Sequence, residues 1–129
     1  MNTSARLNGL RLLLVEDEAL VAMLIHDIVS DAGAIVVGAA PNVEAAISVL
    51  DSQPIDGAIL DVNLGGERVD PVADELSARK IPFLFLTGYG RAGIAERFPA
   101  ATVVTKPFED AHFLAAVSRV LLTERSTPD

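Results

Sequence analysis

Short apolar runs alternate along the chain with segments of helical periodicity. The runs cover residues 10–15, 34–38, 56–61, 82–87 and 101–105. Each is long enough for a strand and too short for a helix. Their residues are largely apolar rather than alternating with polar ones, which indicates burial on both faces. Strands of this kind are typical of a parallel sheet that helices cover on both sides.

The helical segments lie between these runs and after the last one. Their predicted ranges are 19–31, 42 to about 52, 70 to about 79, and 109–122. Acidic residues precede the first helix, which suits its dipole, and Asn42 is a candidate N-cap for the second. The last helix is amphipathic. Its predicted buried residues are Phe113, Leu114, Val117, Val120 and Leu121.

This order of elements predicts an α/β fold, namely a doubly wound, five-stranded parallel sheet in a flavodoxin-like three-layer sandwich. Residues 1–129 are interpreted as one domain, with its core at about 9–123 and frayed termini. The stretch 88–100 fits this pattern poorly. Because it is rich in glycine, we do not expect a firm fourth helix there.

Polar side chains follow four of the predicted strands at their carboxyl ends. They are Glu16 and Asp17 after the first strand, Asp61 at the end of the third, Thr87 at the end of the fourth and Lys106 after the fifth. The carboxyl ends of parallel strands meet at one edge of the sheet, so these side chains are expected to converge. Taken singly, each can be explained as a helix cap, a turn residue or a loop residue. Their coincidence at one edge predicts a functional site.

The residue types in this set suit phosphoryl transfer. Crowded carboxylates need a proton or a cation, and Mg²⁺ prefers hard oxygen ligands. Glu16, Asp17 and Asp61 are therefore candidate Mg²⁺ ligands, with a water expected between Glu16 and the metal. Asp61 is also a candidate nucleophile, because aspartyl phosphates are established covalent intermediates. Lys106 would neutralise charge on a transferring phosphoryl group, and the Thr87 hydroxyl would donate to it.

Composition excludes several classes of protein. No cysteine is present, so a disulfide scaffold, a thiolate metal site and a cysteine nucleophile are excluded. A net charge of −8 argues against binding to nucleic acid or to an anionic membrane surface. No apolar run is long enough to span a membrane, and the N-terminus lacks a signal-peptide pattern. We therefore expect a cytoplasmic protein.

Four segments of the chain resemble the receiver domains of bacterial two-component response regulators: LRLLLVEDEALV, ILDVNLGGE, FLFLTGYG and VVTKPF. The resemblance covers nearly the whole chain. It implies a role for each matching site residue. The implied roles are phosphoacceptor for Asp61, Mg²⁺ ligand for Glu16, Asp17, Asp61 and the backbone carbonyl of Asn63, and phosphoryl-oxygen binding for Thr87 and Lys106.

The same resemblance implies partners. The phosphoryl donor would be a phosphohistidine on a sensor histidine kinase, of the HWE class or a related one, or on a histidine phosphotransfer protein. Such a domain is not an enzyme in the usual sense, because it catalyses only its own phosphorylation and dephosphorylation. We expect no separate output domain, so the expected output is protein contact or service as a phosphate sink. The expected contact face is the fifth strand with the last helix, and we expect a monomer or a weak homodimer through that face.

Two features differ from most of this family. Val103 stands where most members carry a switch tyrosine or phenylalanine, and Thr87 and Lys106 are unusually close in sequence. The string FLFLTGYG resembles a subgroup with an F-x-T-G motif, no switch aromatic and a fourth helix that is short or mobile. We hypothesise that phosphorylation draws Thr87 inward and orders residues 88–98. Tyr89 is then the alternative switch residue, or else only a loop side chain. The resemblance also implies a cis bond before Pro107.

Two other functions fit parts of the pattern. Haloacid-dehalogenase-type phosphatases also use a strand-end aspartate, Mg²⁺, a hydroxyl and a lysine, but Asn63 stands where they carry a second aspartate. A phosphorylation-independent interaction module would use the same fold without the complete set of site residues. Among the remaining polar side chains, His26 and His112 are interpreted as surface or packing residues, and Arg91 and Arg97 as solvated loop charges.

Overall fold

The computed structural model describes residues 6–88 and 97–125. Its main sheet consists of β1 (Arg11–Val15), β2 (Ile35–Ala40), β3 (Gly57–Asp61), β6 (Phe83–Thr87) and β7 (Val103–Thr105). All neighbouring strands of this sheet are parallel, in the order β2-β1-β3-β6-β7. The chain runs from β1 to β2 on one side of β1, and then returns to β3 on the other side of β1. The carboxyl ends of β1 and β3 are therefore the switch point of the fold, where such sheets place their sites.

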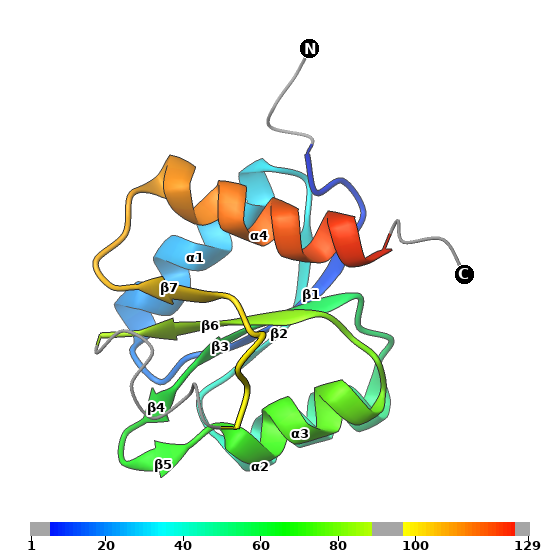
Figure 1. Cartoon of the computed structure of the whole chain (residues 1–129), viewed down its shortest axis with the longest axis vertical. Helices are drawn as coiled ribbons and strands as arrows, with labels where there is room; N and C mark the ends of the chain where they lie inside the picture. The colour runs from blue at the N-terminus through cyan, green and yellow to red at the C-terminus, as the bar shows by residue number, and fades with distance from the viewer. Residues whose placement is uncertain (1–5, 89–96, 126–129) are drawn as a thin grey trace.

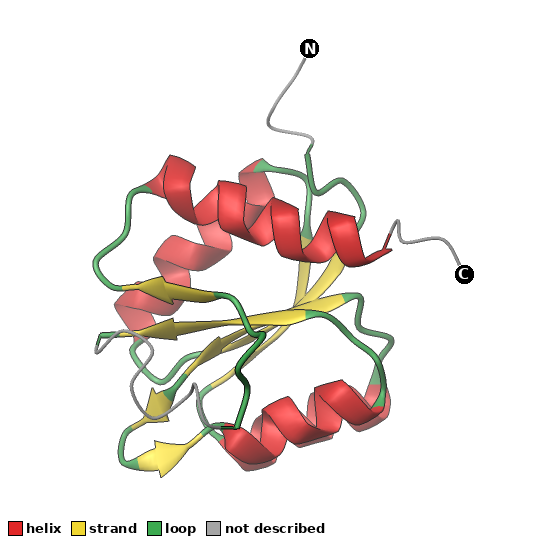
Figure 2. Ribbon diagram, viewed as in Figure 1, coloured by secondary structure: helices red, strands yellow, loops and turns green. Residues whose placement is uncertain are grey.

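Helices cover both faces of this sheet (Figures 1 and 2). The first face carries α1 (Ala19–Asp31) and α4 (Asp110–Arg125), and the second carries α2 (Val43–Ser52) and α3 (Asp70–Ala78). The predicted doubly wound α/β sandwich is thus confirmed. Within the described ranges, the helices are all too short or too polar to cross a membrane.

The sheet divides the apolar core into two layers, because successive strand residues point to opposite faces. Leu12 and Leu14 of β1 pack in the layer under α1 and α4. Leu13 and Val15 pack in the layer under α2 and α3. Every residue of β3 is buried. This two-sided burial explains why the strands are apolar throughout rather than alternating.

Local sequence explains where two of the helices begin. Oδ1 of Asn42 accepts a hydrogen bond of 2.8 Å from the backbone N–H of Ala45, so the predicted N-cap of α2 is confirmed. Pro71 stands in the first turn of α3, where the missing N–H of proline has no partner to lose. The start of α1 differs. Glu18 holds the N-cap position without a side-chain capping bond, and the first turn contains no acidic residue.

Some boundaries differ from the prediction. β2 extends to Ala40, because its last residues pair with β1 although glycine and alanine give little strand signal. β7 begins at Val103 rather than at residue 101, and α4 continues to Arg125. Within α4, Leu114 is only half-buried, whereas Phe113 is fully buried. The other predicted residues of that helix are buried too, namely Val117, Val120 and Leu121.

The sequence did not indicate a short antiparallel hairpin that follows β3. It pairs β4 (Asn63–Leu64) with β5 (Glu67–Arg68). Gly65 and Gly66 form its turn at positive φ angles of 63° and 97°, and the N–H of Gly66 donates to Asn63 Oδ1 at 2.8 Å. Strands this short carry no readable apolar alternation, although adjacent glycines are a turn signal.

Two further expectations concern the second half of the chain. The peptide bond before Pro107 is cis, as the resemblance implied. The expected short or mobile fourth helix concerns residues 88–100, of which 89–96 lie outside the described residues.

Candidate functional site

Four strand ends bring together the side chains that the sequence singled out. Lys106 follows β7 and lies between two carboxylates, with its Nζ 3.2 Å from Glu16 Oε1 and 3.3 Å from Asp61 Oδ2. Glu16 and Asp61 are each 5% exposed, and Thr87 is buried beside them at the end of β6. The backbone N–H of Lys106 donates to the carbonyl of Thr87 at 2.8 Å, which fixes the end of β7 beside β6.

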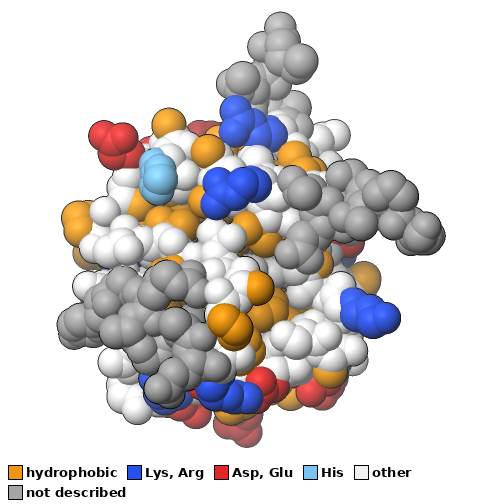
Figure 3. Space-filling model, viewed as in Figure 1, with side chains coloured by type: hydrophobic (Ala, Val, Ile, Leu, Met, Phe, Trp, Pro, Cys, Tyr) orange, Lys and Arg blue, Asp and Glu red, His pale blue; other side chains and the backbone are white. Residues whose placement is uncertain are grey.

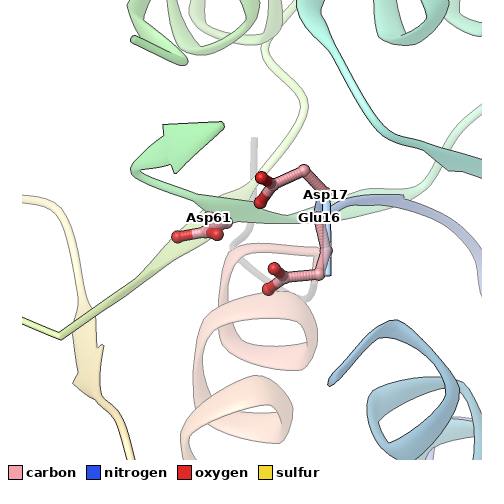
Figure 4. A group of neighbouring side chains, drawn as sticks. All are labelled: Glu16, Asp17 and Asp61. Carbon is pink, nitrogen blue, oxygen red and sulfur yellow. The ribbon is translucent and has the colours of Figure 1, made fainter. Parts of the chain in front are cut away.

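Three carboxylates share this edge of the sheet. Glu16, Asp17 and Asp61 each offer an oxygen, and these oxygens all lie within 4.8 Å of one another. Figure 4 shows the three carboxylates directed toward a common space. Glu16 and Asp61 are buried, whereas Asp17 is exposed. The group is therefore accessible to solvent from the side of Asp17.

Burial disturbs ionisation in this group. The pKa of Glu16 is raised to about 7. Burial is the largest cause and the neighbouring Asp61 adds to it, while a backbone hydrogen bond from Glu18 and attraction to Lys106 act in the opposite direction. For Lys106, burial disfavours the charged form, but attraction to Asp61 and Glu16 outweighs this and the pKa is raised. The lysine therefore remains charged at neutral pH, while Glu16 is close to its titration point.

An open hollow of about 580 Å³ lies over these side chains. The hairpin forms one of its walls, through Asn63, Gly65, Gly66 and Arg68. Gly65 approaches the acidic group closely, since a Cβ at this position would lie 3.2 Å from Oδ2 of Asp17, at a φ of +63°. A larger residue in the turn would thus be strained and would also crowd a candidate metal ligand.

The donor set suits a hard divalent cation. All three candidate ligands offer carboxylate oxygens, which Mg²⁺ prefers. The raised pKa of Glu16 comes first from burial and then from the neighbouring Asp61, and attraction to Lys106 offsets it only in part. A bound cation would favour the ionised carboxylate further. The hollow leaves room for the waters that Mg²⁺ commonly keeps and for a phosphoryl group. The residues present therefore fit this ion.

The other predicted site residues have different surroundings. The N–H of Asn63 donates to Asp61 Oδ1 at 3.4 Å, so this residue lies beside the candidate nucleophile. Val103 is half-buried in β7 and packs against the core layer under α2 and α3. Tyr89 lies outside the described residues. His26 and His112 are exposed, in agreement with their interpretation as surface side chains.

Two charged side chains at the site, Glu18 and Arg68, were not singled out from the sequence. Glu18 Oε1 lies 3.6 Å from Lys106 Nζ, and Arg68 lines the hollow from β5. The acidic run that contains Glu18 was a signal for it, whereas an isolated arginine in a loop gave none. Arg97 is an exposed loop side chain, in agreement with its interpretation, and its guanidinium also forms ion pairs with Asp70 and Asp74 of α3. The corresponding interpretation of residue 91 lies outside the described residues.

A family model of the response regulator receiver domain matches residues 12–118. The chain belongs to this family. Receiver domains are signalling regulators of two-component systems rather than classical enzymes, and they interact with histidine kinases or phosphotransfer proteins. They generally bind Mg²⁺ at an acidic pocket, and this receiver domain has an acidic group of that kind.

Individual relatives are similar over most of the receiver domain. The phyllosphere-induced regulator PhyR of Methylorubrum extorquens is 32% identical over 119 residues, which are 89% of this chain and 45% of PhyR. The solution structure of SdrG from Sphingomonas melonis is 40% identical with a TM-score of 0.76, covering 85% of this chain and 94% of SdrG. The crystal structure of PhyR from Brucella abortus is 30% identical with a TM-score of 0.82, covering 92% of this chain and 50% of PhyR. The receiver domain spans about half the length of the curated relatives it matches.

Proposed function

We propose that this receiver domain accepts a phosphoryl group on Asp61 from a phosphohistidine, with Mg²⁺ held by Glu16, Asp17, Asp61 and the backbone carbonyl of Asn63. The position of Lys106 carries the proposal. Its ammonium contacts two buried carboxylates beneath an open hollow. A cation in that position neutralises the charge that collects on a transferring phosphoryl group.

The proposed reaction is a displacement at phosphorus. A carboxylate oxygen of Asp61 attacks the phosphorus atom, a new P–O bond forms, and the P–N bond to the donor histidine breaks. The electron pair of that bond stays on the imidazole nitrogen, which takes up a proton. Lys106 and the Thr87 hydroxyl bind oxygens of the phosphoryl group during transfer. Bound Mg²⁺ supplies further neutralisation of the oxygen charges.

A donor protein must bring its histidine to Asp61, so it must contact the surface beside the hollow. The start of α1 is such a surface, because the helix begins directly after Glu18. Apolar side chains are exposed along this helix. Leu20 is 81% exposed, Met23 61% and Leu24 45%. Burial of such side chains against a partner is favourable, which supports α1 as part of the donor-binding surface.

The proposed output is contact with another protein, or competition for phosphoryl groups as a phosphate sink. One relative of known structure, PhyR from Bartonella quintana, bears the name anti-anti-sigma factor, at 27% identity and a TM-score of 0.82. For this chain the face formed by β7 and α4 remains the predicted contact surface, for an output partner or a weak homodimer. A cytoplasmic location is part of the proposal, as the composition and the lack of a signal-peptide pattern led us to expect.

The switch hypothesis has two parts, and both stay predictions. The first is that phosphorylation draws Thr87 inward; this residue is 3% exposed and lines the hollow. The second is that residues 88–98 become ordered, of which 89–96 lie outside the described residues. Hydrogen exchange with and without a phosphoryl mimic measures it directly, and unchanged protection would contradict it.

The decisive test of phosphorylation is intact-mass spectrometry after incubation with acetyl phosphate. The expected result is the addition of one phosphoryl group, only with Mg²⁺, to the wild type and not to Asp61→Asn. The matched control is Asp31→Asn, which removes an exposed carboxylate at the end of α1 and should react as the wild type does. Absence of any adduct on the wild type would favour either a donor that must be a kinase or the phosphorylation-independent interaction module. A Mg²⁺ titration would then separate these two.

A further inference from the structure

Two basic side chains line the hollow among the described residues, and the proposed reaction uses only Lys106. The other is Arg68, at the end of the hairpin, with a side chain that is 52% exposed. Its guanidinium makes a two-point contact with Asp70, with Nε 3.0 Å from Oδ1 and Nη2 3.2 Å from Oδ2. A guanidinium binds phosphate oxygens through the same two-point geometry.

Arg68 can leave Asp70 without depriving that carboxylate of a positively charged partner. Arg97 also binds Asp70, with Nη1 3.2 Å from Oδ2, and its Nη2 lies 2.9 Å from Asp74 Oδ1. Both aspartates would therefore keep a cation if Arg68 turned away. Figure 3 shows acidic and basic side chains side by side at the lower edge of the view, where β5 and the start of α3 lie in Figure 1. Exposed ion pairs of this kind are individually weak.

The backbone of the hairpin is held by a separate contact. Oε1 of Glu67 accepts a hydrogen bond of 3.2 Å from the backbone N–H of Val43, the first residue of α2. Within the hairpin, the N–H of Gly66 donates to the side chain of Asn63. The side chain of Arg68 can therefore change its partner while the wall of the hollow stays in place.

The negative charge of a phosphorylated site would favour movement of the Arg68 side chain from Asp70 to the hollow. A phosphoryl group on a side chain carries about two negative charges at neutral pH. Together with the carboxylates of Glu16 and Asp17, it exceeds the positive charge that one divalent ion and Lys106 supply. Glu18, only 3.6 Å from Lys106 Nζ, adds a further negative charge. The phosphorylated site would thus attract another cation, and Arg68 is the one that already lines the hollow.

We propose that Arg68 is a second anion-binding side chain of this site, which leaves Asp70 and binds the phosphoryl oxygens from the hairpin wall. This inference rests on the proposed function of Asp61 as phosphoacceptor. It assigns to the hairpin a role in holding the phosphoryl group, in addition to shaping the hollow.

The test compares three variants in the complete chain by the binding of beryllofluoride, a phosphoryl mimic, in the presence of Mg²⁺. Arg68→Gln should weaken beryllofluoride binding by about tenfold, because a charge-assisted contact is lost. Asp70→Asn breaks the same ion pair but leaves the arginine, so binding should equal or exceed that of the wild type. Arg79→Gln removes a positive charge that pairs with Asp51 and Glu75, away from the hollow, and should change binding less than twofold. Two-dimensional NMR follows the titrations and verifies that each variant is folded.

The outcomes separate the possible roles. If Arg68→Gln and Asp70→Asn weaken binding equally, the ion pair only holds the hairpin, and the proposal is wrong. If Arg68→Gln and Arg79→Gln weaken it equally, the effect is one of net charge, and the proposal is again wrong. Mg²⁺ affinity without beryllofluoride should not fall in Arg68→Gln. Failure of Asp61 phosphorylation itself would appear in the wild type, as a lack of any mass adduct, and is thereby distinguished from failure of this inference.

Discussion

The ammonium of Lys106 lies 3.2 Å from Oε1 of Glu16, a carboxylate whose side chain is completely buried. This contact sets a lysine and a divalent cation in competition for the same oxygens, because Glu16 is also a candidate metal ligand. Under the proposed function, the lysine would bind the transferring phosphoryl group and would also limit the affinity of the site for the metal.

Replacing Lys106 should therefore separate metal binding from phosphorylation. Lys106→Met is expected to increase Mg²⁺ affinity by about threefold to tenfold, since a nearby like charge is removed. It should lower the rate of phosphorylation by acetyl phosphate by about a hundredfold or more, since charge on the phosphoryl oxygens is no longer neutralised. Calorimetric Mg²⁺ titration and timed mass spectra measure the two effects. A fall in Mg²⁺ affinity would show that the lysine supports the metal site instead of competing with it.

Metal binding should depend on pH through Glu16. Its pKa of about 7 in the metal-free protein lies above the ordinary value of 4.5. Because the metal binds the ionised carboxylate, apparent Mg²⁺ affinity should rise by about tenfold between about pH 6 and 8. The stability of the metal-free protein should change with pH in the opposite direction. The contribution of Glu16 to the unfolding free energy is complete below its unfolded pKa and is lost as pH rises through about 7.

The matched control for this dependence is Glu16→Gln, which cannot ionise at this position. Its residual Mg²⁺ affinity should be nearly independent of pH over the same interval. A wild-type affinity that does not change with pH would mean that Glu16 is already ionised in the metal-free protein.

At acid pH the domain should lose the contribution that Asp70 makes to its unfolding free energy. Burial opposes its ionisation, but hydrogen bonds and attraction from Arg68 and Arg97 outweigh this, so its pKa is lowered from the usual 3.8. A carboxylate of this kind stabilises the fold above its unfolded pKa, and the effect is lost as pH falls through the folded value. The difference in unfolding free energy between the wild type and Asp70→Asn should be constant near neutral pH and shrink below pH 3.8. Urea unfolding followed by circular dichroism measures it, and a difference that widens in acid would exclude this account.

Loss of the cap on α2 should destabilise the whole domain. Asn42→Ala removes the acceptor for the N–H of Ala45 and is expected to lower the unfolding free energy by about 1 kcal/mol. Asn42→Asp keeps an acceptor oxygen and should remain within a few tenths of a kcal/mol of the wild type. Urea denaturation of both variants tests the difference. Equal losses would point to a role of the amide NH₂ group.

The sequence predicted which side chains converge at the strand ends, but it did not predict all of the elements around them. Glu16, Asp61, Thr87 and Lys106 could be placed together because each ends or follows an apolar run, and parallel strands end at one edge. That rule needs only the order of the elements. It is insensitive to errors of one or two residues at strand ends, such as the late start of β7 at Val103.

The hairpin and the arginine contacts follow from tertiary structure and could not be predicted in the same way. Each strand of the hairpin has two residues, so no periodicity identifies it. Arg97 meets Asp70 and Asp74 only after the chain has crossed β6, and charge alone does not select a partner so far away in sequence. The burial of small residues such as Ala116, beside the half-buried Leu114, likewise depends on how α4 is rotated against the sheet.

The two layers of the core have a consequence for how the domain tolerates change. Leu14 and Leu13 are adjacent in sequence, yet one belongs to the layer under α1 and α4 and the other to the layer under α2 and α3. Side chains in different layers have few shared neighbours, so the energetic effects of substitutions in the two layers should add. Within a layer, substitutions of residues that contact one another should be non-additive. The core layer on one side of the sheet can thus change in sequence while the layer on the other side keeps its packing. The site at the strand ends can be kept as well.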